Sequence, residues 1–244
     1  MTFNSLQYAA FLPLVFALYW VLARRSQNLL LLAASYFFYG SFDWRFLGLL
    51  MASTATDFTV GRLLDRTDDD RTRRLIFSCS LVVNLGILGF FKYFDFFSGE
   101  ATRFLGHLGV HLAPPVIRIL LPVGISFYTF HGMSYTFDVF RRKIEPTRDL
   151  VAFAVFVSFF PQLVAGPIGR AHLQLPQFER DRTWPGADRL GRAVALILLG
   201  LFKKVAIADA LAPYVDKAFT GGSGQGSISL VLGVYAFALQ IYGD

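Results

Sequence analysis

Three polar side chains interrupt long apolar runs of this sequence, and one of them could take part in proton transfer. His131 lies within the hydroxyl-rich stretch Ser126–Tyr135. A neutral imidazole there can line a polar passage or accept a proton as a base, because imidazole titrates near neutral pH. The alternative is an imidazole that only hydrogen-bonds to a neighbouring helix, since polar pairs between membrane helices are common.

The other two polar side chains are Asp57 and Gln162. Asp57 follows four small residues, Ser53–Thr56, which permit close approach of a second helix. We expect its carboxyl group to pair with an arginine or a hydroxyl group of another span. Gln162 lies between Pro161 and the Gly166-Pro167 pair. Its amide can satisfy backbone groups that the prolines leave unpaired, or it can face a substrate, since irregular backbone at membrane depth usually lines a cavity.

The sequence predicts no metal site. His107 and His111 are four residues apart, but Leu108 stands where a zinc protease carries its glutamate, so we expect an interfacial amphipathic turn. Lys203 and Lys204 interrupt an apolar run, and we expect them to extend to the membrane interface. There is no P-loop, dinucleotide-binding fingerprint or nucleophile elbow.

The composition of the chain indicates that these residues lie on membrane helices. Apolar residues make up 55% of the 244 residues and charged residues 16%, against roughly 25% in soluble domains. The mean hydropathy of +0.50 and the 27 phenylalanines exclude a soluble globule and a disordered chain. The single cysteine, Cys79, excludes a disulfide scaffold. We attribute the net charge of +6 to cytoplasmic loops rather than to nucleic-acid binding, because no basic face or nucleic-acid motif is present.

The apolar runs predict an all-α polytopic membrane protein with about seven or eight helical segments, some of them short, kinked or re-entrant. The segments are Leu6–Leu22, Leu29–Phe42, Trp44–Leu64, Leu75–Phe91, Val116–Phe140, Leu150–Ile168, Ala193–Ala208 and Ile228–Tyr242.

Basic residues predict the orientation of these segments. Arg24 and Arg25, the five arginines from Arg62 to Arg74, and the basic stretch Arg141–Arg148 follow the first, third and fifth segments. The connections between them, Gly40–Asp43 and Asp95–Pro115, hold only Arg103. The positive-inside rule then places the N-terminus outside and the basic loops in the cytoplasm.

The alternation of basic and non-basic loops fails after the fifth segment. The stretch Gly169–Arg192 is basic as well, although it follows Leu150–Ile168. We therefore predict that Leu150–Ile168 kinks at Pro161 and returns to the side from which it entered. Broken backbone at this depth is tolerated only inside protein or beside a water-filled cavity, so this region is a candidate site.

The residues around these breaks resemble the membrane-bound O-acyltransferase family, and within it the branch of the alginate O-acetyltransferase membrane subunit. The similar stretches run through the chain in the order found in that family. They are the opening from Asn4-Ser5 to Tyr19-Trp20, Ser53-Thr54 to Asp57-Phe58, Leu121–Phe130, Ser134–Arg141, Phe159–Ile168 and Gly200–Asp209.

The resemblance implies an enzyme of the bacterial inner membrane that spans the membrane several times. Such an enzyme takes an acyl group, here acetyl, from a cytoplasmic donor such as acetyl-CoA or an acyl carrier. It passes the group through the membrane to hydroxyls of an extracellular polysaccharide, and no bound cofactor is expected. The implied partners are membrane lipid, the acyl donor, and a periplasmic acyltransferase or other polysaccharide-modifying protein.

The resemblance also limits the site. The active-site histidine of the family lies in its second half, and no residue of this chain matches that motif. Related sequences often carry glutamine where His131 stands, which argues against an obligatory base. We therefore predict no catalytic residue here and a substrate passage lined by side chains from two stretches. These residues are Pro122, Gly124, Ser126, Tyr128, Thr129, His131, Tyr135, Pro161, Gln162, Gly166 and Pro167.

Two alternatives and one expectation about length remain. The residues are also compatible with a non-catalytic membrane subunit or truncated fragment, and with a transporter or channel, where broken helices are common. Gly221–Gly226 is expected to be a flexible connector. The last apolar run reaches Asp244 without a polar tail. We therefore expect residues 1–244 to form one membrane domain, the N-terminal half of a longer acyltransferase.

Overall fold

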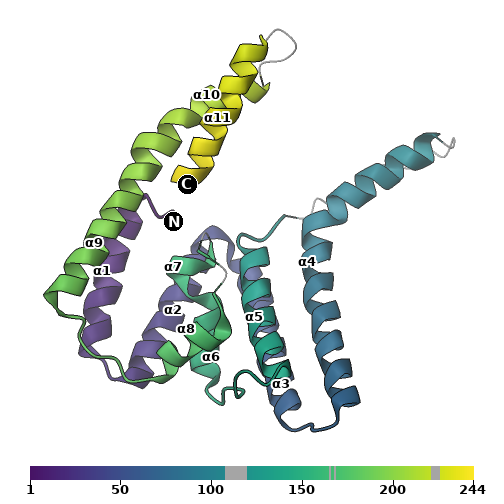
Figure 1. Ribbon diagram of the computed structural model, residues 1–244, viewed down its shortest axis with the longest axis vertical. Helices are drawn as coiled ribbons and strands as arrows, with labels where there is room; N and C mark the ends of the chain where they lie inside the picture. The colour runs from purple at the N-terminus through teal and green to yellow at the C-terminus, as the bar shows by residue number, and fades with distance from the viewer. Residues whose placement is uncertain (108–119, 165, 168, 221–225) are drawn as a thin grey trace. The chain divides into compact units, whose positions relative to one another are not determined.

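The computed structural model describes residues 1–107, 120–164, 166–167, 169–220 and 226–244, and these form helices without any strand (Figure 1). The helices are α1 (Leu6–Val21), α2 (Arg24–Asp43), η1 (Trp44–Phe46), α3 (Leu47–Asp65), α4 (Asp70–His107), α5 (Ile125–Phe140), α6 (Leu150–Ser158), α7 (Phe160–Leu163), α8 (Ala171–Glu179), α9 (Gly186–Phe202), η2 (Lys203–Ala208), α10 (Asp209–Thr220) and α11 (Ser227–Gly243).

The all-α prediction is confirmed for the described residues, but the count of seven or eight spans is not. By length and composition, one described helix, α4, is long and apolar enough to cross a membrane. The helices α1 and α11, and the α6–α7 stretch, are apolar but shorter. The remaining segments are helical, yet polar residues or breaks interrupt them.

Two predicted connections between segments are helical where the structure describes them. Helix α2 continues through Gly40–Asp43, and α4 continues from Asp95 to His107, which lengthens the predicted segment Leu75–Phe91 to 38 residues. No proline interrupts this part of α4, and Glu100 and Arg103 form an ion pair three residues apart that suits a helix surface. His107 ends α4, while His111 and the start of the predicted segment Val116–Phe140 lie outside the described residues.

Helix α5 begins later than predicted, at Ile125. Pro122 and the residues around it are not helical, and Gly124, directly before the helix, has a φ of +72°. A residue with a side chain would be strained in that left-handed conformation. The Pro122–Gly124 turn therefore sets the first residue of α5.

The break in the segment Leu150–Ile168 lies at Phe159, two residues before the predicted kink at Pro161. A proline ring clashes with the carbonyl four residues earlier in a continuous helix, so α6 must end before it. Pro161 instead stands in the first turn of the short helix α7, where its missing N–H costs nothing. The Phe160 N–H donates to the Ser35 hydroxyl of α2 at 3.1 Å.

The chain divides into two compact units, each described by itself: Leu14–Arg182, and Met1–Pro13 with Thr183–Asp244. In Leu14–Arg182, α3, α4 and α5 pack against one another, and α6 packs against α2, α3, α5 and α8. Every residue of α6 from Ala152 to Ser158 is buried, which explains why this helix is apolar all round. Phe153 of α6 contacts the buried Tyr135 ring of α5, with centroids 4.5 Å apart.

The helix ends that carry basic residues meet in this unit. Buried Arg73, near the start of α4, donates to the carbonyls of Val139 and Phe140 at the end of α5, and to that of Leu64 at the end of α3. A cation there complements the negative ends of two helix dipoles. Asp69 caps α4, and the Thr72 hydroxyl that donates to it holds the pKa of Asp69 below its usual value.

The α1–α2 corner and α8 join the same group of helix ends. The Arg24 guanidinium donates to the carbonyl of Glu179 at the end of α8, and the Glu179 carboxylate accepts from the Thr147 hydroxyl before α6. The two flanks of the 150–168 stretch therefore lie together, as the predicted return to one side requires. The sidedness of the chain in a membrane stays a prediction.

In the other unit, the two lysines are paired. Lys203 donates to the Tyr242 hydroxyl at 2.9 Å, and Lys204 forms an ion pair with Asp209 at 2.8 Å and another with Asp244. The lysines begin the π-helix η2, which packs against α11. Both lysine side chains therefore bind polar groups of the protein. The sequence had predicted only that they extend to the membrane interface.

Candidate functional site

The two stretches that the sequence singled out, Pro122–Tyr135 and Pro161–Pro167, contact each other. Gly124, at the start of α5, lies so close to the end of α7 that a Cβ on it would be 2.7 Å from the Leu163 carbonyl oxygen. Only glycine fits this approach, and only glycine adopts its φ without strain. The start of α5 is therefore packed directly on the broken segment, which is the predicted stretch Leu150–Ile168 interrupted at Phe159.

A second contact joins the middle of α5 to the turn before α8. The Gly169 N–H donates to His131 Nε2 at 3.1 Å, and the Ser134 hydroxyl donates to the Gly169 carbonyl at 3.2 Å. His131 Nδ1 lies 2.9 Å from the Phe127 carbonyl, which can only accept, so Nδ1 carries the hydrogen. Both nitrogens of the buried imidazole are therefore engaged, one by the backbone of its own helix and one by the backbone before α8, whereas the alternative had expected a neighbouring helix.

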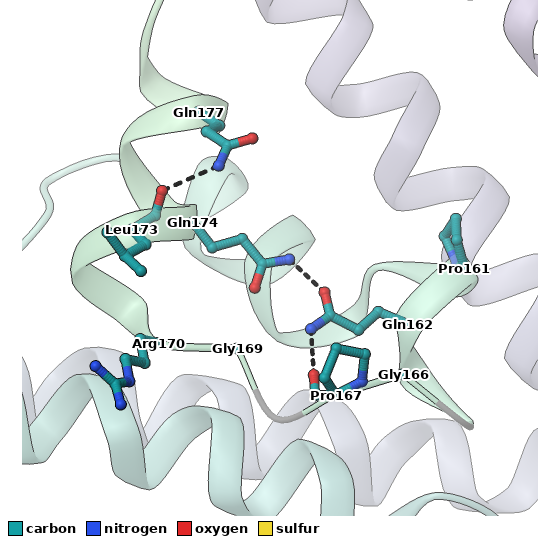
Figure 2. A pocket seen from close by; sticks show the side chains of 9 residues that line it. All are labelled: Pro161, Gln162, Gly166, Pro167, Gly169, Arg170, Leu173, Gln174 and Gln177. Atoms are coloured by element: carbon teal, nitrogen blue, oxygen red, sulfur yellow. Dashed lines mark hydrogen bonds between the residues drawn. The ribbon is translucent and has the colours of Figure 1, made fainter. Parts of the chain in front are cut away.

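The broken segment and α8 line a cavity of about 450 Å³ that is open to the outside (Figure 2). Gln162 crosses it: its Nε2 donates to the Pro167 carbonyl at 2.5 Å, and its Oε1 accepts from Gln174 Nε2. The amide thus satisfies a carbonyl beside a proline, as one of the two interpretations predicted, and it also faces a cavity. The lining residues are Pro161, Gln162, Gly166, Pro167, Gly169, Arg170, Leu173, Gln174 and Gln177.

Four of the predicted passage residues line this cavity: Pro161, Gln162, Gly166 and Pro167. The seven predicted residues from the other stretch do not line it; they are Pro122, Gly124, Ser126, Tyr128, Thr129, His131 and Tyr135. Most of them are buried by close packing, and Tyr128, for example, lies edge-on to Tyr39 of α2. Their part in a passage stays a prediction.

Asp57 is fully buried and pairs with α4, through the amide of Asn84, which was not expected, and more distantly through the expected kind of partner, a hydroxyl group, on Ser80. Its Oδ1 accepts from Asn84 Nδ2 at 2.8 Å and from the Ser80 hydroxyl at 3.4 Å. Its Oδ2 faces Gly132 of α5, where a Cβ would lie 1.9 Å away. The carboxyl group therefore sits where α3, α4 and α5 meet.

Sequence reasoning missed the contribution of α8. Arg170, directly before α8, and Leu173, Gln174 and Gln177 of α8 all line the cavity. The spacing of three residues between Gln174 and Gln177, next to Leu173, is the signal that places the three helical residues on one side of the helix. A different face carries His172, whose Nδ1 lies 2.9 Å from Asp138 Oδ2 at the end of α5. This pair ties α8 to α5 next to the cavity.

No group of three histidine, cysteine, aspartate or glutamate side chains that could hold a metal ion occurs among the described residues. The groups that converge at the cavity are amides, one guanidinium and backbone carbonyls. Such groups bind a substrate by hydrogen bonds and charge, and they supply no nucleophile.

Comparison with known proteins shows which proteins the chain is similar to. Over 237 residues, 96% of its length, the chain is 39% identical to a probable alginate O-acetylase, AlgI, of Azotobacter vinelandii, and covers 46% of that protein. It is 36% identical to the probable alginate O-acetylase AlgI of Pseudomonas aeruginosa and 30% identical to a peptidoglycan O-acetyltransferase of Helicobacter pylori. The chain is homologous to these O-acetylases.

This homology confirms the resemblance to the membrane-bound O-acyltransferase family. The chain spans about half the length of the O-acetylases that it matches. No protein-family model matches the chain, and no solved structure matches it.

Proposed function

We propose that the protein is a membrane-bound O-acyltransferase that moves an acetyl group from a cytoplasmic donor to hydroxyls of an extracellular polysaccharide. The homology to alginate and peptidoglycan O-acetylases supports acyl transfer to a polysaccharide. In this proposal the chain sits in the bacterial inner membrane, crosses it several times, and works with a periplasmic polysaccharide-modifying partner.

The observation that carries the proposal is the cavity on the broken segment. Phe159–Ile168 is one of the stretches that resemble the family, and its described residues Pro161, Gln162, Gly166 and Pro167 supply nearly half of the lining. Non-helical backbone at membrane depth is tolerated beside such a cavity. The cavity is therefore our candidate for a substrate-binding part of the passage.

In this role the chain binds and positions, and we assign it no catalytic residue. Gln162 is held on both sides, by the Pro167 carbonyl and by Gln174, so the cavity wall is fixed before a substrate arrives. A thioester donor would be shielded from water in a closed passage, which prevents hydrolysis. The family resemblance assigns the proton of the attacking hydroxyl to a histidine whose motif none of the four histidines of this chain matches.

Replacing Gln162 with leucine tests the proposal. Gln162→Leu removes two hydrogen bonds, to Pro167 and to Gln174, and keeps a side chain of about the same size in the wall. We expect polymer-linked acetyl to fall about tenfold, because two modest hydrogen bonds together are worth about 1.4 kcal/mol on a barrier. Acetyl groups on the purified polysaccharide are measured in cells that carry each variant. Gln7→Leu, an exposed glutamine of α1, is the matched control.

The same variants separate the enzyme from the alternatives. In a transporter or channel, Gln162→Leu would change the flux of a solute and leave acetylation intact. A non-catalytic subunit would support acetylation equally well with either variant. Either result would overturn the proposed function.

A further inference from the structure

A cluster of buried polar side chains lies where α3, α4 and α5 meet, apart from the cavity. Its members are Ser53 and Asp57 of α3 and Ser80 and Asn84 of α4. Asp57 is the acid of this cluster, and none of its surface is exposed. A carboxylate is costly to bury unless a cation or several hydrogen-bond donors compensate its charge. The groups around Asp57 therefore determine whether its carboxyl group can be ionised.

The first carboxyl oxygen of Asp57, Oδ1, faces α4. Asn84 Nδ2 donates to Asp57 Oδ1 at 2.8 Å and to the Ser80 carbonyl at 3.1 Å, which uses both of its hydrogens. The Ser80 hydroxyl lies 3.4 Å from Asp57 Oδ1, which is longer than a typical hydroxyl hydrogen bond. Oδ1 therefore receives one short hydrogen bond, and that bond comes from an uncharged amide.

The second carboxyl oxygen of Asp57, Oδ2, receives no hydrogen bond from any described residue. It lies against the backbone of α5 at Gly132, where an added Cβ would be only 1.9 Å away. The C–H groups of a glycine are weak donors and cannot compensate a full negative charge. A carboxylate accepts about four hydrogen bonds, and this carboxyl group has a single short one. The geometry of the cluster therefore does not suit a carboxylate.

Among the described residues, no cation compensates such a charge. Asp57 takes part in none of the ion pairs of the described chain. On its own helix, Arg62 pairs with Asp65 instead. Buried Arg73 of α4 donates to backbone carbonyls at the ends of α3 and α5. Both arginines are therefore engaged elsewhere.

The titratable side chains on the neighbouring helices contact other groups. On α5, His131 has both nitrogens engaged by backbone groups, Tyr128 packs on a tyrosine of α2, and Tyr135 lies against Gly61 of α3. On α4, Cys79 is exposed. Helix α6, which also packs on α3, carries no titratable side chain. The described part of the chain thus offers Asp57 no titratable partner.

We propose that Asp57 carries a proton in the folded protein, so that a neutral carboxylic acid joins α3 to α4 and α5. The proton removes the charge that the surroundings do not compensate. Oδ1 is then the carbonyl oxygen that accepts from Asn84, and Oδ2 is the hydroxyl oxygen, which needs no donor. The proton is taken up while the helices pack, so the finished cluster needs no opening to solvent. The joint of the three helices is therefore sensitive to alkaline pH.

Infrared difference spectroscopy of the protein in nanodiscs tests the protonation of Asp57. A carboxylic acid and a carboxylate absorb in separate regions of the spectrum. At neutral pH, we expect Asp57→Asn to remove a carboxylic acid band and to leave the carboxylate bands unchanged. Asp68→Asn, which replaces an exposed aspartate in the loop before α4, is the matched control and should remove carboxylate absorption only.

The proposal is overturned if Asp57→Asn removes carboxylate absorption, as its control does. Should Asp57→Asn not fold, the unaltered protein labelled with carbon-13 in its aspartate carboxyl groups still decides. Its spectrum at neutral pH must contain an aspartic acid band that the label shifts. A spectrum with carboxylate bands alone would show that Asp57 is ionised.

The pH dependence of unfolding is a second readout. An aspartate in the unfolded chain is ionised at neutral pH, so the folded state binds one proton more than the unfolded state. Stability must then fall as the pH rises, and one unit of pH shifts the unfolding equilibrium about tenfold toward the unfolded chain. Asp57→Asn cannot titrate at this position and should lack this tenfold contribution. Unfolding in detergent at two pH values on either side of neutrality measures the difference.

An equal pH dependence of the unaltered protein and Asp57→Asn would contradict the proposal. A bound metal cation is the other way to compensate a buried carboxylate. If replacing sodium and potassium by a large organic cation destabilises the unaltered protein and leaves Asp57→Asn unaffected, the carboxyl group is ionised and holds a cation, and the assignment of a proton is wrong.

Discussion

At the scale of single residues, His131 shows how a polar side chain within an apolar run can have a structural role. Its Nδ1–H donates to the Phe127 carbonyl and its Nε2 accepts from the Gly169 N–H, so neither nitrogen is available to a substrate. The imidazole ring also lies edge-on to Phe156, with centroids 5.6 Å apart. His131 therefore holds the turn before α8 in place, and with it one edge of the cavity.

This assignment predicts a difference between two replacements of His131. Glutamine can still accept from the Gly169 N–H, so His131→Gln should change the free energy of unfolding by less than about 1 kcal/mol. Alanine leaves that N–H buried without a partner and opens a void, so His131→Ala should cost about 3 kcal/mol. Unfolding in detergent measures both, and a polysaccharide acetylation assay accompanies it. Loss of acetylation in a stable His131→Gln protein would show that the imidazole itself is needed.

At the scale of helices, the junction of α3, α4 and α5 depends on a missing side chain. Asp57 Oδ2 occupies the space that a Cβ of residue 132 would need, and the Tyr135 ring likewise lies where a Cβ of Gly61 would be. Small residues at helix crossings allow this close approach in membranes. The polar contact between Asp57 and Asn84 therefore exists only because α5 carries glycine opposite to it.

Adding one methyl group at this junction should loosen it. Gly132→Ala forces Asp57 or the backbone of α5 to move, and we expect a loss of about 2 kcal/mol in the free energy of unfolding. Gly86→Ala on α4 is the matched control, because nothing lies within 4 Å of its added Cβ. In a helix that control should gain about 0.5–1 kcal/mol. Equal effects of the two variants would contradict the close packing of α5 on Asp57.

At the scale of the molecule, contacts connect basic segments that are far apart in the sequence. Arg73 reaches the end of α5, Thr147 reaches Glu179, and Arg24 reaches the same glutamate. Within the unit Leu14–Arg182 these helix ends therefore form one group, and the positive-inside rule assigns such a group to the cytoplasm.

Cysteine labelling tests this orientation. In a Cys79→Ser background, Arg71→Cys and Arg180→Cys place a thiol on two exposed sites in basic segments, and Thr2→Cys places one near the N-terminus. An impermeant maleimide should label Thr2→Cys in intact cells and label the other two only after permeabilisation. Labelling of Arg71→Cys and Arg180→Cys from opposite sides would show that the 150–168 stretch crosses the membrane instead of returning.

The sequence by itself determined the class, the family resemblance and the region of the site. Fifty-five per cent apolar residues exclude a soluble fold, and the Pro161–Pro167 stretch is recognisable because proline and glycine break a helix wherever they occur. These properties belong to the residues and to their local backbone, so no distant contact is needed to predict them.

Only the tertiary structure decided which polar groups are available for binding. That His131 has both nitrogens engaged depends on Gly169, 38 residues away, and the cavity depends on α8 folding back over Gln162. Arg170 and Gln174 look like ordinary polar residues in the sequence. The folded chain brings both of them to the wall of the cavity beside Gln162, and such a neighbourhood exists only in three dimensions.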